Sequence, residues 1–331
     1  MKLLFVDLYY KTIEIKERNW KIGGRGLASL ILDEYPTSIV IAPGLLTGTS
    51  APTGGRYTVA GDTRNGLHFS NLGGFIGSYI KGYGYFAVVF LKSSDGPLIV
   101  EFSSSGVQFR SALDFLGLGT KEVERKLSKD GKKVMAVGPA GEMGSKISAV
   151  VAEGFRVAGR GMGELFFRKG VKALVFNPAT YVFHNSVFIE RAKQLKQDLK
   201  AVDEGVRIAH PCYGCPIKCL AYDERGKKGI VRVFEDLNIE ESKWRKIVDT
   251  ANDLGVDIFG AYLVHKRTGM NFEDILKMAS EGEDFNIEYP QDRPTTWESF
   301  LDSAGICKYA AEKVDRREIE KLVEIYKEVI R

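Results

Sequence analysis

The chain has 331 residues, of which 44% are hydrophobic and 27% are charged, and its formal net charge is +4. This length allows two or three domains with a substantial buried core. The small net charge does not indicate nucleic-acid binding, and no apolar run is long enough to span a membrane. Because Asp7 interrupts the apolar N-terminus, we expect no signal peptide and a cytoplasmic location. Abundant Lys and Glu with only four Gln are typical of a heat-loving source.

The first half of the chain alternates between short β-branched or aromatic runs and glycine-rich turns. Runs of this kind, bounded by turn residues, predict strands. Two helical patterns interrupt them, at residues 26–32 and at residues 120–127, where Val123 and Leu127 are spaced i, i+4. The predicted strands cover residues 3–8, 38–42, 56–60, 86–91, 98–102, 134–137, 147–152 and 173–176.

Helical periodicity dominates the second half. In the last helical pattern, Ile319, Leu322 and Tyr326 share one face. A polar stretch with two prolines, residues 281–296, predicts a linker. The predicted helices cover residues 187–201, 243–254, 272–280 and 318–330.

The glycine distribution indicates a boundary between these halves. Residues 1–176 contain 27 of the 36 glycines. We therefore predict an α+β protein, with a sheet-rich cofactor-binding domain at residues 1–177 and a mainly helical domain that carries the cysteines at residues 178–331.

The four cysteines predict a metal cluster. Cys212, Cys215 and Cys219 lie within eight residues (CYGCPIKC), and Cys307 is far away in the sequence. Three thiolates in so short a loop can wrap one compact inorganic core, which a fourth thiolate closes, as in a 4Fe-4S cluster. A structural zinc site usually pairs two Cys-x-x-Cys motifs, and a reducing cytosol disfavours disulfides. The spacing favours the cluster, with zinc as the alternative.

Four glycine-rich stretches of the first half could contact a phosphate-bearing cofactor. Glycine lets backbone N–H groups approach an anion, and a neighbouring arginine can grip phosphate with two hydrogen bonds. A single stretch of this kind is usually only a turn, but three of these four carry arginine. Residues 138–146 (GPAGEMGSK) do not fit a P-loop, and residues 159–163 lack the Rossmann glycine spacing. The four stretches are residues 22–26, 49–57, 71–74 and 156–161.

Taken in order, these motifs resemble the tungsten-containing aldehyde:ferredoxin oxidoreductase family. Residues 46–57 (LTGTSAPTGGRY) are similar to a motif of the family's first domain. The other similar stretches are residues 71–74, 138–142, 156–161, 212–219 and 301–307.

The resemblance implies a tungsten (or molybdenum) pyranopterin beside a 4Fe-4S cluster, with magnesium bridging the pterin phosphates. Asp302 and Ile306 would touch a pterin next to the cluster ligand Cys307. Residues 252–257 (NDLGVD) resemble another pterin motif, in which Asp257 is kept and Asn252 replaces a carboxylate. The residues implied to hold the phosphates and magnesium are Arg56, Asn71, Gly73, Arg156, Val157, Gly159 and Arg160.

The resemblance also implies an activity, namely oxidation of an aldehyde to a carboxylic acid with electrons passed through the cluster to ferredoxin. Glu235, in residues 232–236 (RVFED), matches an acid near the metal and is the expected base, with Val233 in place of a second family acid. Alternatively, Glu235 is one more acid in a charged run.

One departure from the family leaves the activity open. The short stretch between Asp257 and Asp302 lacks the family's second pterin motif and its histidine. A non-catalytic subunit that relays electrons or holds a cofactor is therefore the alternative function, and a purely structural paralogue is a third. For each of these functions, the chain could form a homo-oligomer or associate with a partner subunit.

Overall fold

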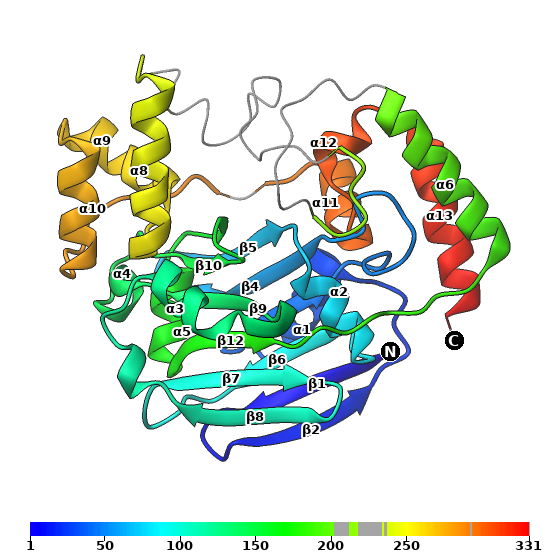
Figure 1. Cartoon of the computed structure of the whole chain (residues 1–331), viewed down its shortest axis with the longest axis horizontal. Coiled ribbons are helices and arrows are strands. Elements are labelled where there is room, and N and C mark those ends of the chain that lie inside the picture. Colours follow the sequence, from blue (N-terminus) through cyan, green and yellow to red (C-terminus); the bar gives the residue numbers. More distant parts are fainter. Residues whose placement is uncertain (202–211, 218–233, 235–236, 292, 331) are drawn as a thin grey trace.

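The computed structural model describes residues 1–201, 212–217, 234, 237–291 and 293–330. It confirms the predicted α+β class with a sheet-rich N-terminal region, because the strands of the described part all lie within residues 2–176. Two six-stranded sheets pack against each other, and helices surround them (Figure 1).

The first sheet has the strand order β2-β1-β6-β3-β4-β5. β1 and β6 run parallel, whereas every other neighbouring pair is antiparallel. Its strands are β1 (Lys2–Asp7), β2 (Thr12–Glu17), β3 (Ile39–Pro43), β4 (Tyr57–Thr63), β5 (Gly66–Leu72) and β6 (Ala87–Leu91).

The second sheet has the order β11-β10-β9-β12-β7-β8. β7 and β12 run parallel, and the other neighbouring pairs are antiparallel. Its strands are β7 (Leu98–Ser103), β8 (Gly106–Ser111), β9 (Lys133–Val137), β10 (Val150–Ala152), β11 (Arg156–Ala158) and β12 (Val171–Phe176).

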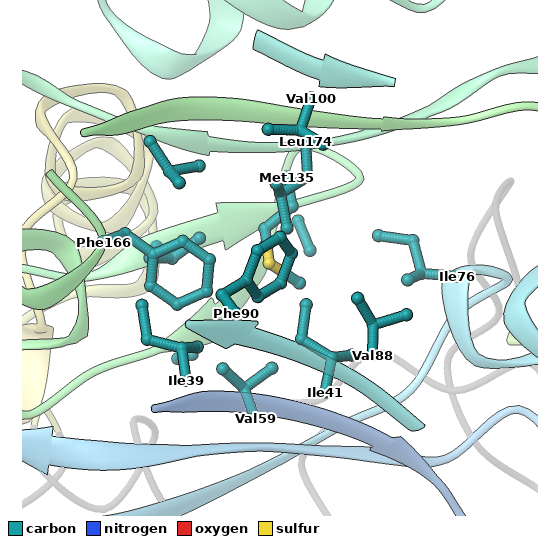
Figure 2. Packing of buried hydrophobic residues seen from close by; sticks show 14 of the residues in the cluster. Ile39, Ile41, Val59, Ile76, Val88, Phe90, Val100, Met135, Phe166 and Leu174 are labelled. Carbon is teal, nitrogen blue, oxygen red and sulfur yellow. The ribbon is translucent and has the colours of Figure 1, made fainter. Parts of the chain in front are cut away.

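Apolar side chains from both sheets form one core between them (Figure 2). Side chains alternate between the two faces of a strand, so Ile39 and Ile41 enter this core while Val40 faces the other side of the sheet. Phe90 of the first sheet and Phe102 of the second meet edge to face, with ring centroids 6.1 Å apart. Because both faces of the central strands are buried, their sequences are almost continuously hydrophobic.

Helices cover the outer faces and the ends of this core. α1 packs on the first sheet through Leu27 and Ile31, and α3 packs on the second through Val123 and Leu127. α2 and α5 add side chains to the core between the sheets. The elements are α1 (Gly24–Glu34), α2 (Ile76–Gly82), α3 (Thr120–Leu127), α4 (Pro139–Glu142), α5 (Met162–Arg168) and the 3-10 turns η1 (Leu113–Phe115) and η2 (Lys129–Gly131).

The helices after residue 178 form two groups on opposite sides of the sheets (Figure 1). One group packs on Ala140 and Ile147, and the other packs on Leu45 and Leu46. No helix in the described part is both long enough and apolar enough to cross a membrane. The first group is α8 (Glu241–Leu254), α9 (Ile258–Thr268) and α10 (Phe272–Ser280); the second is α6 (Ser186–Ala201), α11 (Thr296–Ala304), α12 (Lys308–Ala311) and α13 (Arg316–Val329).

In its described residues, the predicted linker has no regular structure over most of its length, but hydrogen bonds hold it to other elements. The Tyr289 hydroxyl donates to Asp257 at 3.0 Å, and the Pro290 carbonyl accepts from Arg160 at 2.9 Å. Thr295 then caps α11 in a capping box with Glu298. The described parts of the segment, on either side of residue 292, are therefore each held by hydrogen bonds.

Lys81 in α2 is fully buried. Its Nζ donates to the Leu45 carbonyl at 3.3 Å and to the Tyr326 hydroxyl at 2.7 Å. It also lies over the rings of Phe86, Tyr181 and Tyr326, with the nearest centroid 3.8 Å away. Burial lowers the pKa of Lys81 well below its ordinary value. Lys81 thus links α13 to the loop that follows β3.

Replacing Lys81 with methionine is expected to remove a pH dependence of stability. Between the lowered pKa of folded Lys81 and about 10.5, only the unfolded chain holds the proton, so the free energy of unfolding rises with pH. The slope reaches at most about 1.4 kcal/mol per pH unit. Urea unfolding from neutral pH upward measures it, and the exposed Lys266→Met variant should keep it. A slope unchanged in Lys81→Met would assign the effect to another group.

Candidate cofactor site

The cysteine loop is docked on loops of the sheet-rich half. The backbone N–H of Tyr213 donates to the Gly74 carbonyl at 3.1 Å, and the Tyr213 hydroxyl donates to the Gly48 carbonyl at 3.0 Å. In the described residues, the thiols of Cys212 and Cys215 form no disulfide. Their predicted companion Cys219 lies outside the described residues.

Gly73 and Gly74 make room for this loop. A Cβ added to Gly73 would lie 2.5 Å from the sulfur of Cys212, far inside van der Waals contact. Gly74 has a φ of +117°, and a Cβ there would lie 2.1 Å from Oε1 of Glu153. Only glycine allows this backbone conformation together with so close an approach.

Arg156 lies between a buried carboxylate and a cysteine. Its guanidinium is 3.3 Å from Oε2 of Glu153 and 3.7 Å from the sulfur of Cys212. Burial opposes its charge, but Glu153 and Cys212 together raise the pKa of Arg156 above its ordinary value. Oε1 of Glu153 accepts the backbone N–H groups of Phe75 and Ile76, at the start of α2. A positive charge, held in place by Glu153, therefore stands beside the Cys212 sulfur.

Cys307 is held to the same region by Thr53. The backbone N–H of Cys307 donates to Oγ1 of Thr53 at 3.1 Å, and the N–H of Thr53 donates to the Gly214 carbonyl at 3.3 Å. Gly305, which ends α11, has a φ of +84° and packs against the Thr47 hydroxyl. Thr53 thus bonds both to the cysteine loop and to the distant cysteine.

Three of the four predicted cluster ligands, Cys212, Cys215 and Cys307, lie in the described residues. Cys215 and Cys307 pack on one small apolar cluster, formed by Leu199, Ile217 and Ala310. Among the described residues, no three Cys, His, Asp or Glu side chains stand close enough together to form a metal site. Soft thiolates suit iron–sulfur clusters and zinc alike. The iron–sulfur cluster and its ligand Cys219 therefore stay predictions.

A polar cavity of about 330 Å³ is lined by three of the predicted cofactor residues, Arg56, Asn71 and Asp302. The Asn71 amide donates to Oδ2 of Asp302 at 2.7 Å and accepts from the Thr58 hydroxyl at 2.6 Å. This chain of hydrogen bonds joins β4, β5 and α11 across the cavity wall. Asn71 and Asp302, two predicted cofactor residues that are far apart in the sequence, thus lie in direct contact.

The charge of this cavity suits an anion. Arg25, Arg293 and Lys308 also line it, so four basic side chains face two acidic ones. Nε of Arg56 is buried and has no hydrogen-bond partner in the part of the chain that the structure describes. A buried N–H without a partner is costly, and a phosphate oxygen would satisfy it. The cavity therefore fits a phosphate-bearing group.

Asp257 organises a second predicted group, which lies at β11 and α9. Its carboxylate accepts the backbone N–H of Arg160 at 3.0 Å, the Tyr289 hydroxyl at 3.0 Å and the N–H of Phe259 at 3.1 Å. A Cβ on Gly159 would lie 2.5 Å from the Asp257 carboxyl carbon. Burial raises the pKa of Asp257, and the hydrogen bonds partly oppose this. Asp257 therefore caps α9 and fixes the turn at Arg160.

Some predicted residues have other surroundings. Gly24 has a φ of +48° and packs on the Asp302 carbonyl, so the first glycine-rich stretch serves the contact between α1 and α11. The Ile306 side chain is buried among apolar residues, and Val157 pairs with Val151 in the second sheet. Glu235 lies outside the described residues.

Thr53 and Glu153 are site residues that sequence reasoning missed. Both have positive φ, +58° for Thr53 and +50° for Glu153, which the sequence does not reveal. The only available signal for Thr53 is its position within the motif at residues 46–57.

Comparison with known proteins gives one family. The family model described as "Aldehyde ferredoxin oxidoreductase, N-terminal domain" matches residues 3–178. The chain is 35% identical over 198 residues to the tungsten-containing aldehyde ferredoxin oxidoreductase of Pyrococcus furiosus, and 33% identical over 196 residues to that of Thermococcus kodakarensis. Each match covers 52% of this chain and 32% of the relative, so the chain matches only about a third of those proteins' length.

The fold has a counterpart among solved structures. It matches the active site complex BamBC of benzoyl coenzyme A reductase, solved in complex with 1,5-dienoyl-CoA, with a TM-score of 0.70. The match covers 98% of this chain and 64% of the other, at 18% sequence identity. This likeness concerns the fold alone.

Proposed function

Since this chain belongs to the aldehyde ferredoxin oxidoreductase family, we propose that it binds a tungsten pyranopterin beside a 4Fe-4S cluster and acts as an oxidoreductase. The observation that carries the proposal is the basic cavity with the unpartnered Arg56 Nε, in the part of the chain that the structure describes. Arg56 also passes close to Gly73, which touches Cys212, so the cavity and the cysteine loop are neighbours.

In this proposal the cavity residues hold a pterin phosphate. Arg56 donates its guanidinium to phosphate oxygens, while Asn71 and Asp302 bind the pterin or its magnesium from β5 and α11. Arg25, from the first glycine-rich stretch, adds positive charge, and so does Lys308, which lay outside the sequence motifs. The remaining proposed contacts are Gly73, Arg156, Val157, Gly159, Arg160, Asp257 and Ile306.

The proposed cluster ligands are Cys212, Cys215, Cys219 and Cys307. When bound, the two cofactors supply a two-electron acceptor for an aldehyde and a carrier that passes single electrons to ferredoxin. The chain's own contribution is to hold them side by side and to keep Arg156 next to a cluster ligand. Magnesium, ferredoxin and the aldehyde are part of this proposal.

Replacing Arg56 with alanine is expected to lower bound pterin about tenfold or more, because a charge-assisted hydrogen bond to phosphate is lost. Lysine should not restore binding, since it lacks Nε and the planar fork. Arg160→Ala should also lower it. Pterin released from native protein is measured, with the exposed Arg267→Ala variant as control. Unchanged pterin in both the Arg56 and Arg160 variants would identify these segments as structural turns only.

Replacing Glu235 with glutamine is expected to reduce aldehyde oxidation at least a hundredfold while tungsten content stays normal. A general base of this kind contributes about 10²- to 10⁴-fold, and glutamine keeps the shape without the basic group. Steady-state turnover with an artificial electron acceptor measures the effect. A full rate in this variant would remove Glu235 from the mechanism, and no turnover in the loaded wild type would favour a relay subunit.

A further inference from the structure

Thr53 is buried, and its backbone is in the left-handed region with a φ of +58°. A β-branched residue is a clear outlier there, because its side chain crowds the backbone. Glycine would adopt the same conformation without strain. Strain of this kind persists only where the surrounding structure fixes it, and it gathers at functional sites.

The loop around Thr53 is closed by its own hydrogen bonds. The N–H of Gly48 donates to the Gly54 carbonyl at 2.8 Å, and the N–H of Gly55 donates to the Thr53 carbonyl at 2.8 Å. The Thr49 hydroxyl donates to the Leu46 carbonyl at 2.7 Å. These hydrogen bonds fix the conformation of the loop that carries Thr53.

Thr53 forms hydrogen bonds to two segments that are far apart in the sequence. Its N–H donates to the Gly214 carbonyl, between Cys212 and Cys215, and its Oγ1 accepts the N–H of Cys307 at 3.1 Å. Thr53 thus bonds both to the cysteine loop and to Cys307, and these two segments carry the proposed cluster ligands.

We propose that Thr53 is a positioning residue that sets the place of Cys307 relative to the cysteine loop, and so decides whether the cluster keeps its fourth ligand. The inference rests on the proposed function, because it presumes a cluster on these cysteines. Without Oγ1, the Cys307 backbone loses its anchor, and the iron that Cys307 should hold is left without a protein ligand. When a one-electron oxidant such as ferricyanide is added, a cubane cluster in that condition would release one Fe²⁺: a 4Fe-4S cluster of charge 2+ would give a 3Fe-4S cluster of charge 1+, Fe²⁺ and one electron, and the oxidant would take up the electron.

Three substitutions separate the hydroxyl from the backbone strain. Thr53→Ser keeps the hydroxyl, whereas Thr53→Val keeps the β-branched shape and the strain without it. Thr53→Gly removes both. After brief treatment with ferricyanide, we expect about four irons per chain in the wild type and the serine variant, and about three, with the EPR signal of an oxidised three-iron cluster, in the other two.

A second readout does not depend on the cluster. In iron-free protein, Thr53→Gly should melt at a higher temperature than Thr53→Val, because both lack Oγ1 and only glycine relieves the strain, although both variants retain the cluster equally poorly. If Thr53 acted only through protein stability, the glycine variant would both melt higher and hold more iron than the valine variant. Amide hydrogen exchange at Cys307 should quicken in the valine and glycine variants and stay slow in the serine variant.

Cys307→Ala is the reference for loss of the fourth ligand, and Thr53→Val should match its iron content and EPR signal. Four irons in both Thr53→Val and Thr53→Gly, with slow exchange at Cys307, would overturn this inference and leave the proposed function intact. Absence of iron from the wild type itself would overturn both, so the two failures are distinguishable.

Discussion

Replacing Arg156 with alanine is expected to destabilise the protein by about 3 kcal/mol and to abolish iron binding. The substitution leaves the buried carboxylate of Glu153 without its ion-pair partner, and removing one partner of a buried pair costs about 3–5 kcal/mol. It also removes the positive charge 3.7 Å from the sulfur of Cys212. Urea unfolding of iron-free protein and iron analysis measure the two effects separately.

A matched control exists on the surface. Arg125 and Glu122 form an ion pair with the same i, i+3 spacing, but this pair is exposed, so Arg125→Ala should change stability very little. The double variant Glu153→Gln/Arg156→Met removes both buried charges and keeps the oxygen that accepts from the start of α2. It should recover much of the stability and still bind little iron. Normal iron content in this double variant would show that Arg156 does not support the cysteine site.

Replacing Gly73 with alanine is expected to displace Cys212 and to lower iron content at least tenfold. The new methyl group would lie 2.5 Å from the Cys212 sulfur, so the cysteine loop must move. Overpacking of this kind costs about 1–3 kcal/mol. Gly73 has no positive φ, so the effect is steric alone. Iron analysis and the urea midpoint of the variant measure it.

Gly96→Ala is the control, because a Cβ at Gly96 meets nothing within 4 Å and its φ is not positive. A double-mutant cycle with Cys212→Ala tests the contact itself, since that change removes the sulfur that the new methyl group would strike. Gly73→Ala should then cost much less stability than in the wild type. Additive costs, or full iron content in Gly73→Ala alone, would show that Gly73 and Cys212 do not constrain each other.

The central strands could be predicted from the sequence because they are buried on both faces. β3 and β12 are buried throughout and contain few polar residues. The edge strands β2 and β8 were missed, since most of their side chains are exposed and the pattern of a core face is absent. α9 was missed as well, because it mixes Gly260 and Ala261 with charged residues and has no clear apolar stripe.

The candidate site could be predicted only where its residues belong to short sequence motifs. Cysteine spacing predicted Cys212, a glycine-rich stretch with arginine predicted Arg56, and the family resemblance predicted Asn71. The contact of Thr53 with Cys307 joins residues 254 positions apart, and no local pattern encodes it. Gly24 and Gly73 also allow close packing by a backbone carbonyl and a sulfur, a role that the sequence does not distinguish from a phosphate contact.

The content of the site tests the central claim most directly. Protein purified without oxygen from cells grown with tungstate should contain iron, tungsten and pterin in the same preparation. We predict about four iron atoms per chain, with the absorption of an iron–sulfur cluster, together with tungsten and bound pterin. Stoichiometric zinc without iron, or a chain that carries neither tungsten nor pterin, would contradict the proposed function.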